Sequence, residues 1–413
     1  MHLQKREISG VKKIIYSIVT VSALITAFTF GCLLTPIANR CDFNYRMAEI
    51  DCVAHGVDPF KVWNEEIVFK PYYTNNPACR YIPEGCNQMI SVYAPWEYSL
   101  MFLFGLIDGE FGWWIYSALS FVLLFAIALA IRKNISAYGL GDAPSQLLAL
   151  LPLLTVSYPL WSNFQVGNHM AIALSGAVFM GICLNFRRDF AAGICWMLVM
   201  IKPQIGLIFA VPLLLKMRVL TGLLAVALCV LLSVPPVIAC KTSFFDMLRE
   251  PSIATAFAFE GCGTWPKFLC GYFSNETDIV IGLAIGTALC LWMTWLLRRE
   301  KDWLVYLMPA AVCSSCWTYT QAYSHAMGWF LAYAVIKELV RNPYSKAMRI
   351  LAALSLLVLP RFVLAWHGLY AYMGWRFPMS EFVYRSVDSL NSTCTLVLAL
   401  SFCLIKHRRD NKV

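Results

Sequence analysis

Apolar residues in this chain gather into long runs, and short polar or charged segments separate one run from the next. A bilayer core of about 30 Å needs roughly 20 residues of helix, whose backbone groups must be hydrogen-bonded within the segment. About twelve runs are found, at residues 14–34, 92–107, 113–131, 146–160, 170–184, 191–215, 219–239, 279–297, 304–316, 326–336, 350–366 and 393–405. The pattern predicts an all-α polytopic membrane protein of about 12 transmembrane segments, with residues 1–413 forming one integral membrane domain.

Composition and charge agree with this class. The chain is 59% hydrophobic and only 14% charged, which excludes a water-soluble globule. Its net charge of +9 is spread over clusters at the ends of apolar runs, near residues 5–13, 298–301, 337–349 and 406–409. The positive-inside rule places all four clusters in the cytoplasm, so both ends face inward and the number of crossings is even. Topology thus accounts for the charge, and we expect no nucleic-acid partner.

The longest polar stretch, residues 35–95, directly follows the first apolar run. No small-x-small cleavage site follows that run, so we interpret it as an uncleaved span and the stretch as a large first extracytoplasmic loop. Four cysteines in an oxidising compartment can pair in three ways, which predicts one or two disulfides. The four are Cys41, Cys52, Cys79 and Cys86.

A second extracytoplasmic loop is expected at residues 240–278. Between residues 92 and 216 two topologies remain open: either 92–107 crosses and 191–215 is one kinked span, or 92–107 only dips and 191–215 is a re-entrant pair. Both leave the two loops and the turn at 319–325 outside. The outer face is therefore where we look for chemistry.

Asp42 and Lys202 are the main candidates. Asp42 lies a few residues beyond the first span, which would hold a carboxylate near the bilayer surface; the alternative is a solvated loop carboxylate. Lys202 lies deep in an apolar run and precedes Pro203, which suits the first turn of a new half-helix. A buried ammonium costs several kcal/mol without a partner, so Lys202 and Pro203 together indicate a phosphate-binding site. The alternative is a lysine whose side chain extends to the membrane surface.

Weaker candidates are His325, in the predicted outer turn, Gln165 and Asn168, in a polar break between two runs, and Tyr93, at the start of another run. The alternative for His325 is a polar anchor without a ligand. The sequence has no metal-ligand spacing, no Walker lysine and no dinucleotide motif. We therefore expect neither a metal nor a cofactor.

Six short motifs occur in a fixed order along most of the chain. They are Cys41-Asp42-Phe43, Gly56-Val57-Asp58-Pro59-Phe60, Val92-Tyr93-Ala94-Pro95, Phe164-Gln165-Val166-Gly167-Asn168, Met200-Ile201-Lys202-Pro203-Gln204 and the segment from Ser314 to His325. Together they resemble glycosyltransferase family 87, the polyprenyl-phosphate-sugar-dependent membrane mannosyltransferases of the GT-C superfamily. The chain departs from the family pattern at Ala94, where a proline is usual, at Gly167, which precedes Asn168 where the family has Gln-Val-Asn directly, and after Ser314, where no proline follows.

The resemblance implies a GT-C type helical bundle and transfer of a sugar, with mannose the expected one, from a polyprenyl-phosphate donor to a hydroxyl of a lipid-linked or glycan acceptor. Asp42 would be the general base of an inverting displacement. Lys202, His325, Gln165, Asn168 and Tyr93 would bind the donor phosphate or sugar. The family implies a bacterial cytoplasmic membrane, with the active site on its extracytoplasmic face.

Two other classes of membrane protein share some of these features. A transporter or lipid flippase for glycolipid intermediates also uses broken helices and buried polar groups, but usually shows internal repeats, which are not evident in this sequence. A structural membrane subunit would leave Lys202 unexplained. Sugar transfer from a polyprenyl-phosphate donor, compared with uptake into proteoliposomes, distinguishes an enzyme from a transporter.

Overall fold

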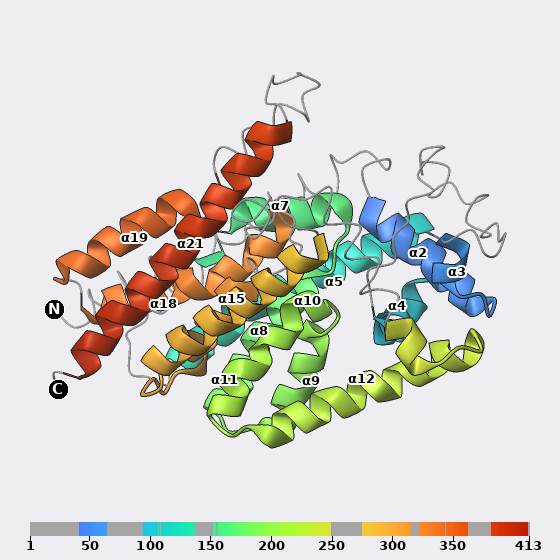
Figure 1. Ribbon diagram of the computed structural model, residues 1–413, viewed down its shortest axis with the longest axis horizontal. Helices are drawn as coiled ribbons and strands as arrows, with labels where there is room; N and C mark the ends of the chain where they lie inside the picture. The colour runs from blue at the N-terminus through green and yellow to red at the C-terminus, as the bar shows by residue number, and fades with distance from the viewer. Residues whose placement is uncertain are drawn as a thin grey trace, which may run out of the picture.

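The computed structural model describes residues 41–63, 94–105, 107, 109–136, 152–153, 156–248, 275–314, 322–342, 344–361 and 381–411. All regular secondary structure in these residues is helical (Figure 1). The first helices are α2 (Cys41–Ala54), α3 (Pro59–Trp63), α4 (Pro95–Gly105), α5 (Gly109–Ser136), α7 (Ser157–Val166) and α8 (Met170–Asn185). The middle ones are α9 (Asp189–Val199), α10 (Pro203–Gly206), η4 (Leu207–Phe209), α11 (Ala210–Leu215) and α12 (Val219–Ala239). The last are α15 (Asn275–Leu296), α16 (Trp303–Tyr306), α17 (Met308–Ser314), η6 (Ala322–Gly328), α18 (Trp329–Arg341), α19 (Lys346–Val358) and α21 (Glu381–Asp410).

Three of the described helices have the length and composition of membrane helices. Within the described residues, the segments Phe111–Arg132, Val219–Ala239 and Val387–Asp410 are long and apolar enough to cross a bilayer. Shorter apolar helices accompany them, at Met170–Asn185, Asp189–Val199, Pro203–Leu215, Val280–Leu296 and Trp303–Ser314. The all-helical membrane character is thus confirmed, while the count of about 12 segments stays a prediction.

Two expectations about local structure change. Of the predicted first loop, residues 41–54 and 59–63 are helical and form α2 and α3, and α2 buries Phe43 and Met47 rather than lying in water. The polar break expected from Trp161 onward is also mostly helical, because α7 continues to Val166. The chain turns only at Gly167.

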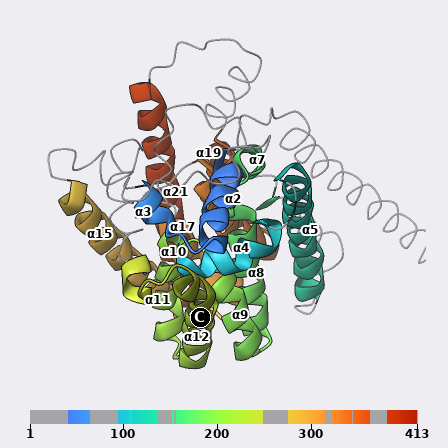
Figure 2. The same ribbon diagram turned by 90° about the vertical axis from the view of Figure 1, so that its right-hand side faces the viewer.

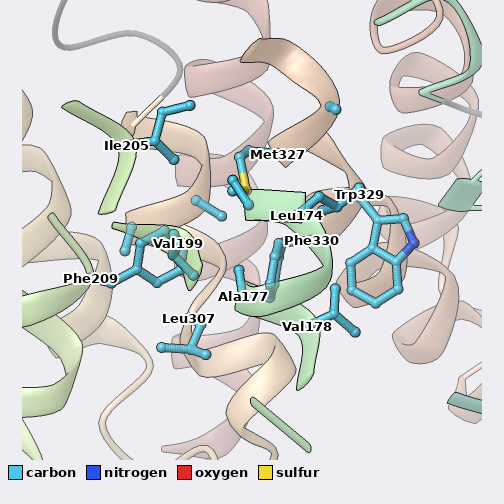
Figure 3. Packing of buried hydrophobic residues seen from close by; sticks show 14 of the residues in the cluster. Leu174, Ala177, Val178, Val199, Ile205, Phe209, Leu307, Met327, Trp329 and Phe330 are labelled. Carbon is cyan, nitrogen blue, oxygen red and sulfur yellow. The ribbon is translucent and has the colours of Figure 1, made fainter. Parts of the chain in front are cut away.

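The core is built on α8, whose side chains are buried along most of its length. Leu174, Ala177 and Val178 of α8 lie among Val199, Phe209, Leu307 and Phe330 in Figure 3. Gly176 allows α9 to come close, since a Cβ at this position would lie 2.8 Å from the backbone oxygen of Cys195. Small residues at such crossings are the usual means of close packing between membrane helices.

A buried network of charges ties the ends of α15, α18 and α21 together. Asp302, at the start of α16, pairs with Lys337 of α18 and accepts a hydrogen bond from the Tyr333 hydroxyl at 3.0 Å. Lys406 of α21 lies 2.7 Å from Glu300. Positive and negative groups alternate here, as expected of a structural network in which every buried charge has a partner.

At the other end of the molecule, α2 lies against α4, α5 and α12 (Figures 1 and 2). The chain leaves α2 through Gly56, whose φ is +72°, a conformation that suits glycine. A Cβ there would lie 2.9 Å from the backbone oxygen of Ala239, so the turn sits directly on the last residue of α12. This contact fixes the position of α2 relative to the membrane helices.

Candidate active site

Asp42 lies in the first turn of α2 and is half-buried. Its Oδ2 accepts a hydrogen bond of 2.7 Å from Nδ2 of Asn168, which follows α7. The neighbouring Phe43 is fully buried, with its ring centroid 5.5 Å from that of Trp113 and 5.4 Å from that of Tyr116. The apolar anchor and the hydrogen bond together hold the carboxylate in place.

The turn that carries Asn168 has its own structural requirements. Gly167 has φ +75°, and a Cβ on it would lie 2.5 Å from the Trp113 ring and 2.6 Å from Phe43. Oδ1 of the buried Asn163 accepts hydrogen bonds from the backbone N–H groups of Met170 at 2.9 Å and Ala171 at 3.2 Å, which would otherwise be unpaired at the start of α8. The polar residues of this segment therefore cap one helix and aim one amide at Asp42.

A chain of hydrogen bonds continues inward from this turn. The Tyr116 hydroxyl of α5 lies 2.9 Å from the backbone oxygen of Asn168 and 2.7 Å from Nδ1 of His169. Nε2 of His169 lies 2.5 Å from Oε1 of Glu97 in α4. Tyr116, His169 and Glu97 are all essentially inaccessible to solvent. Three helices, α2, α4 and α5, and the turn before α8 therefore meet in one buried polar cluster.

Lys202 lies at the break between α9 and α10, where its backbone has left the helical conformation and Pro203 begins the next helix. The prediction of a new helix starting at Pro203 is confirmed. Two indole N–H groups support the break: Trp96 donates to the backbone oxygen of Met200 at 2.7 Å, and Trp196 donates to that of Gly206 at 2.9 Å. Since a break frees backbone carbonyls, these donors stabilise it.

The Lys202 side chain is 2% exposed, so its ammonium is held inside the protein rather than extended to the membrane surface. The charges that act on it are the carboxylates of Asp42 and Glu97 and the guanidinium of Arg46. The charge of Asp42 offsets part of the cost of burying the ammonium, whereas the carboxylate of Glu97 is itself paired with His169. Lys202 and Asp42 thus belong to one electrostatic cluster.

Arg46 is a member of the cluster that the sequence did not single out. It lies one turn after Asp42 on α2, is 5% exposed, and pairs with Glu49 at 2.5 Å. The signal was its spacing, because i and i+4 share one face of a helix. The sequence predicts a loop for this segment, and in a loop residues four apart do not share a face.

His325 lies in η6, which packs against α7 and α8. Its Nε2 is 3.8 Å from Oδ2 of Asp388 in α21, and Asp388 also pairs with Arg361. Arg361 donates a further hydrogen bond of 3.1 Å to the Ser392 hydroxyl. His325 is therefore next to the helix that leads into the Asn168 turn, but no hydrogen bond or ion pair joins it to Asp42 or Lys202.

The remaining candidates are placed only in part. Gln165 lies in α7 and Cys41 begins α2, while Tyr93, Cys79 and Cys86 lie outside the described residues.

Cys52 corrects the disulfide prediction in its own case, because it carries a free thiol. It is buried on α2, where burial first, and then the nearby Glu49 and Asp51 charges, raise the pKa of its thiol. Among the described residues, no group of three or more His, Cys, Asp or Glu side chains is arranged to hold a metal ion.

The all-helical membrane fold and the buried cluster of carboxylates and cations together define the class of the protein: a polytopic membrane protein with a polar site inside its helical bundle. The family model of glycosyltransferase family 87 matches residues 92–318, more than half of the 413 residues. The chain belongs to glycosyltransferase family 87, so it is a membrane glycosyltransferase. No curated protein and no solved structure matched it. The matched region includes Glu97, Asn168 and Lys202, while Asp42 precedes it and His325 follows it.

Proposed function

We propose that the protein transfers a sugar, mannose by the family resemblance, from a polyprenyl-phosphate donor to a hydroxyl of a lipid-linked or glycan acceptor, with inversion at C1. Asp42 is the general base. The observation that carries the proposal is the pairing of a carboxylate oriented by Asn168 with a buried lysine that its charge helps to compensate. The carboxylate of Asp42 can take a proton from the acceptor hydroxyl, and the ammonium of Lys202 can bind the donor phosphate.

In the proposed reaction, Asp42 takes the proton of the acceptor hydroxyl while that oxygen forms a bond to the sugar C1. The bond from C1 to the phosphate oxygen breaks, and its electron pair leaves with the phosphate. A single displacement inverts the anomeric carbon. The leaving phosphate needs no strong acid, so a second catalytic carboxylate of the kind used by glycosidases is not required.

The charges in the cluster fit this sequence of events. Asp42 loses its negative charge as it takes the proton, and the same charge appears on the leaving phosphate. Lys202 then keeps a negative partner throughout, which matters because an uncompensated ammonium is costly where water is excluded. The helix α10 has only four residues, so the side-chain charge rather than a helix dipole would bind the phosphate.

The remaining parts of the site follow from the family. His325, Gln165 and Tyr93 are proposed to contact the donor sugar or phosphate, with η6 bringing His325 beside α7. The four basic clusters support a cytoplasmic location for the opposite end of the bundle, and hence an extracytoplasmic active site in a bacterial cytoplasmic membrane.

The experiment is a transfer assay with purified protein in lipid nanodiscs, radiolabelled polyprenyl-phosphate mannose and a glycolipid acceptor. Asp42→Asn removes the base but keeps the shape and the acceptor for Asn168. We expect its kcat to fall at least about 1,000-fold, with product of inverted anomeric configuration from the wild type. Asp51→Asn, on the same helix but paired with His55, is the matched control and should retain activity. A wild-type rate in Asp42→Asn would exclude the proposed mechanism.

A further inference from the structure

We infer that Glu97, His169 and Tyr116 form a positioning network that orients Asn168, and through it the carboxylate of Asp42. The inference rests on the proposed role of Asp42 as the base, and it gives Asn168 an orienting role in place of the donor-binding role expected from sequence. Glu97 and Tyr116 lie outside the sequence motifs, and His169 directly follows the motif that ends at Asn168.

The geometry makes one continuous chain. Oδ2 of Asp42 accepts a hydrogen bond of 2.7 Å from the side-chain amide of Asn168. The backbone carbonyl oxygen of Asn168 is 2.9 Å from the Tyr116 hydroxyl, and that hydroxyl is 2.7 Å from Nδ1 of His169. The chain ends at Glu97, 2.5 Å from His169. It joins α2, α5, the turn before α8, and α4, so the position of the base depends on four separate segments.

Donor and acceptor roles along the chain are consistent. The single hydroxyl hydrogen of Tyr116 can be donated to the Asn168 carbonyl, which cannot donate in return. Nδ1–H of His169 then donates to the Tyr116 oxygen. The Glu97–His169 pair shares the remaining proton, as a carboxylate with an imidazolium or as a carboxylic acid with a neutral ring. In both forms the pair has no net charge, so it leaves the balance between Asp42 and Lys202 unchanged.

The network positions the base and does not carry its proton away. A relay would have to pass through the side-chain amide of Asn168, which is a hydrogen-bond donor but not an acid at ordinary pH. Asn168 therefore prevents a proton from moving along the hydrogen bonds to or from Asp42. The hydrogen bonds fix positions instead: the hydroxyl of Tyr116 holds the backbone of the turn, and the turn holds the side-chain amide of Asn168 against Asp42.

Stability alone gives a poor reason for this arrangement. Glu97 is 0% exposed, and its Oε2 has no hydrogen-bond partner among the described residues. Apolar side chains of similar size often replace a buried ion pair without loss of stability. A fixed geometry at the base is a function that an apolar contact could not provide, since small displacements of a catalytic group are costly in rate.

The test compares two tyrosines. Tyr116→Phe removes one buried hydroxyl next to the site, and Tyr333→Phe removes one that is bonded to Asp302 in the distant charge network. We expect Tyr116→Phe to lower kcat about tenfold, with the donor KM changed less than about twofold. Tyr333→Phe should lower the thermal midpoint to a similar extent while keeping the kcat of the folded protein.

Variants at Glu97 and Asn168 complete the test. Glu97→Gln offers both a donor and an acceptor to His169 and should retain most of kcat, whereas Glu97→Leu should lose about as much as Tyr116→Phe. Asn168→Ala should lower kcat about 100-fold.

A rise in donor KM with unchanged kcat in Tyr116→Phe would instead indicate substrate binding, and equal kcat in both tyrosine variants would indicate a structural role; either result overturns the inference. Failure of the proposed function is distinguishable, because Asp42→Asn would then be active.

Discussion

The amide nitrogen of Asn168 lies 2.7 Å from Oδ2 of Asp42, although 126 positions separate them in the sequence. The helix that carries the proposed base is therefore attached to the turn between α7 and α8, in the region matched by the family model. Lys202, from the break after α9, acts on the same carboxylate. A carboxylate that lies outside the matched region is thus held by residues inside it.

The first prediction concerns the charge of Lys202. Lys202→Gln keeps most of the side-chain length but removes the positive charge proposed to bind the leaving phosphate. We expect kcat to fall about 100-fold, because a charge aimed at developing negative charge acts mainly on the transition state. The assay is single-turnover transfer from the labelled donor.

The control for this variant is Lys61→Gln, which changes an exposed lysine on α3 in the same way. Its rate should be that of the wild type. A Lys202→Gln protein that turns over within about twofold of the wild type would show that the lysine is only a structural counter-charge.

The second prediction concerns Gly167, the residue that makes the Asn168 turn possible. Gly167→Ala meets two obstacles: a non-glycine residue at φ +75° costs roughly 1–2 kcal/mol, and the new Cβ would lie 2.5 Å from Trp113. We expect a clear drop in the thermal midpoint and a loss of transfer activity even in the folded fraction, because the turn must shift.

Gly222→Ala in α12 is the matched control. Its Cβ would lie 3.3 Å from a single ring atom of Trp196, and its backbone is helical. Alanine favours helix by up to about 1 kcal/mol over glycine, so the midpoint should change little in either direction. Similar losses in both variants would contradict the role assigned to the turn.

The sequence was sufficient for features that depend on local pattern. The apolar run at 219–239 predicts α12 at its observed bounds, and Lys202 followed by Pro203 predicts the helix break. The helix follows from an unbroken apolar run, and the break follows from a charged residue within such a run and the proline next to it. The family resemblance, resting on short ordered motifs, was confirmed by the match of the family model.

What the sequence could not provide depends on packing between distant segments. Glu97 and His169 are 72 positions apart, and each alone resembles an ordinary polar residue near the end of an apolar run. Their significance arises when α4 and the turn before α8 are brought together. His325 shows the same limit, since its position in the sequence did not predict that its Nε2 would lie 3.8 Å from Oδ2 of Asp388.

The last prediction concerns pH and the charge network around Glu300, in the segment between α15 and α16. Burial raises the pKa of this carboxyl, but the charge of Lys406, its hydrogen bond and the backbone N–H of Asp302 outweigh burial and lower the pKa from 4.5 to about 2. A folded-state pKa below the unfolded value means that Glu300 stabilises the protein above about pH 4.5. That contribution is lost as the pH falls toward about 2.

A difference of this size corresponds to roughly 3 kcal/mol of unfolding free energy at neutral pH. Glu300→Gln should therefore lower the thermal midpoint at pH 7, and the difference from the wild type should shrink as the pH approaches 2 to 3. Because the network lies at the end of the bundle opposite α2 (Figure 1), the kcat of the folded variant should match the wild type. A midpoint difference that stays constant between pH 7 and pH 3 would show that the lost stability comes from packing rather than from the charge of Glu300.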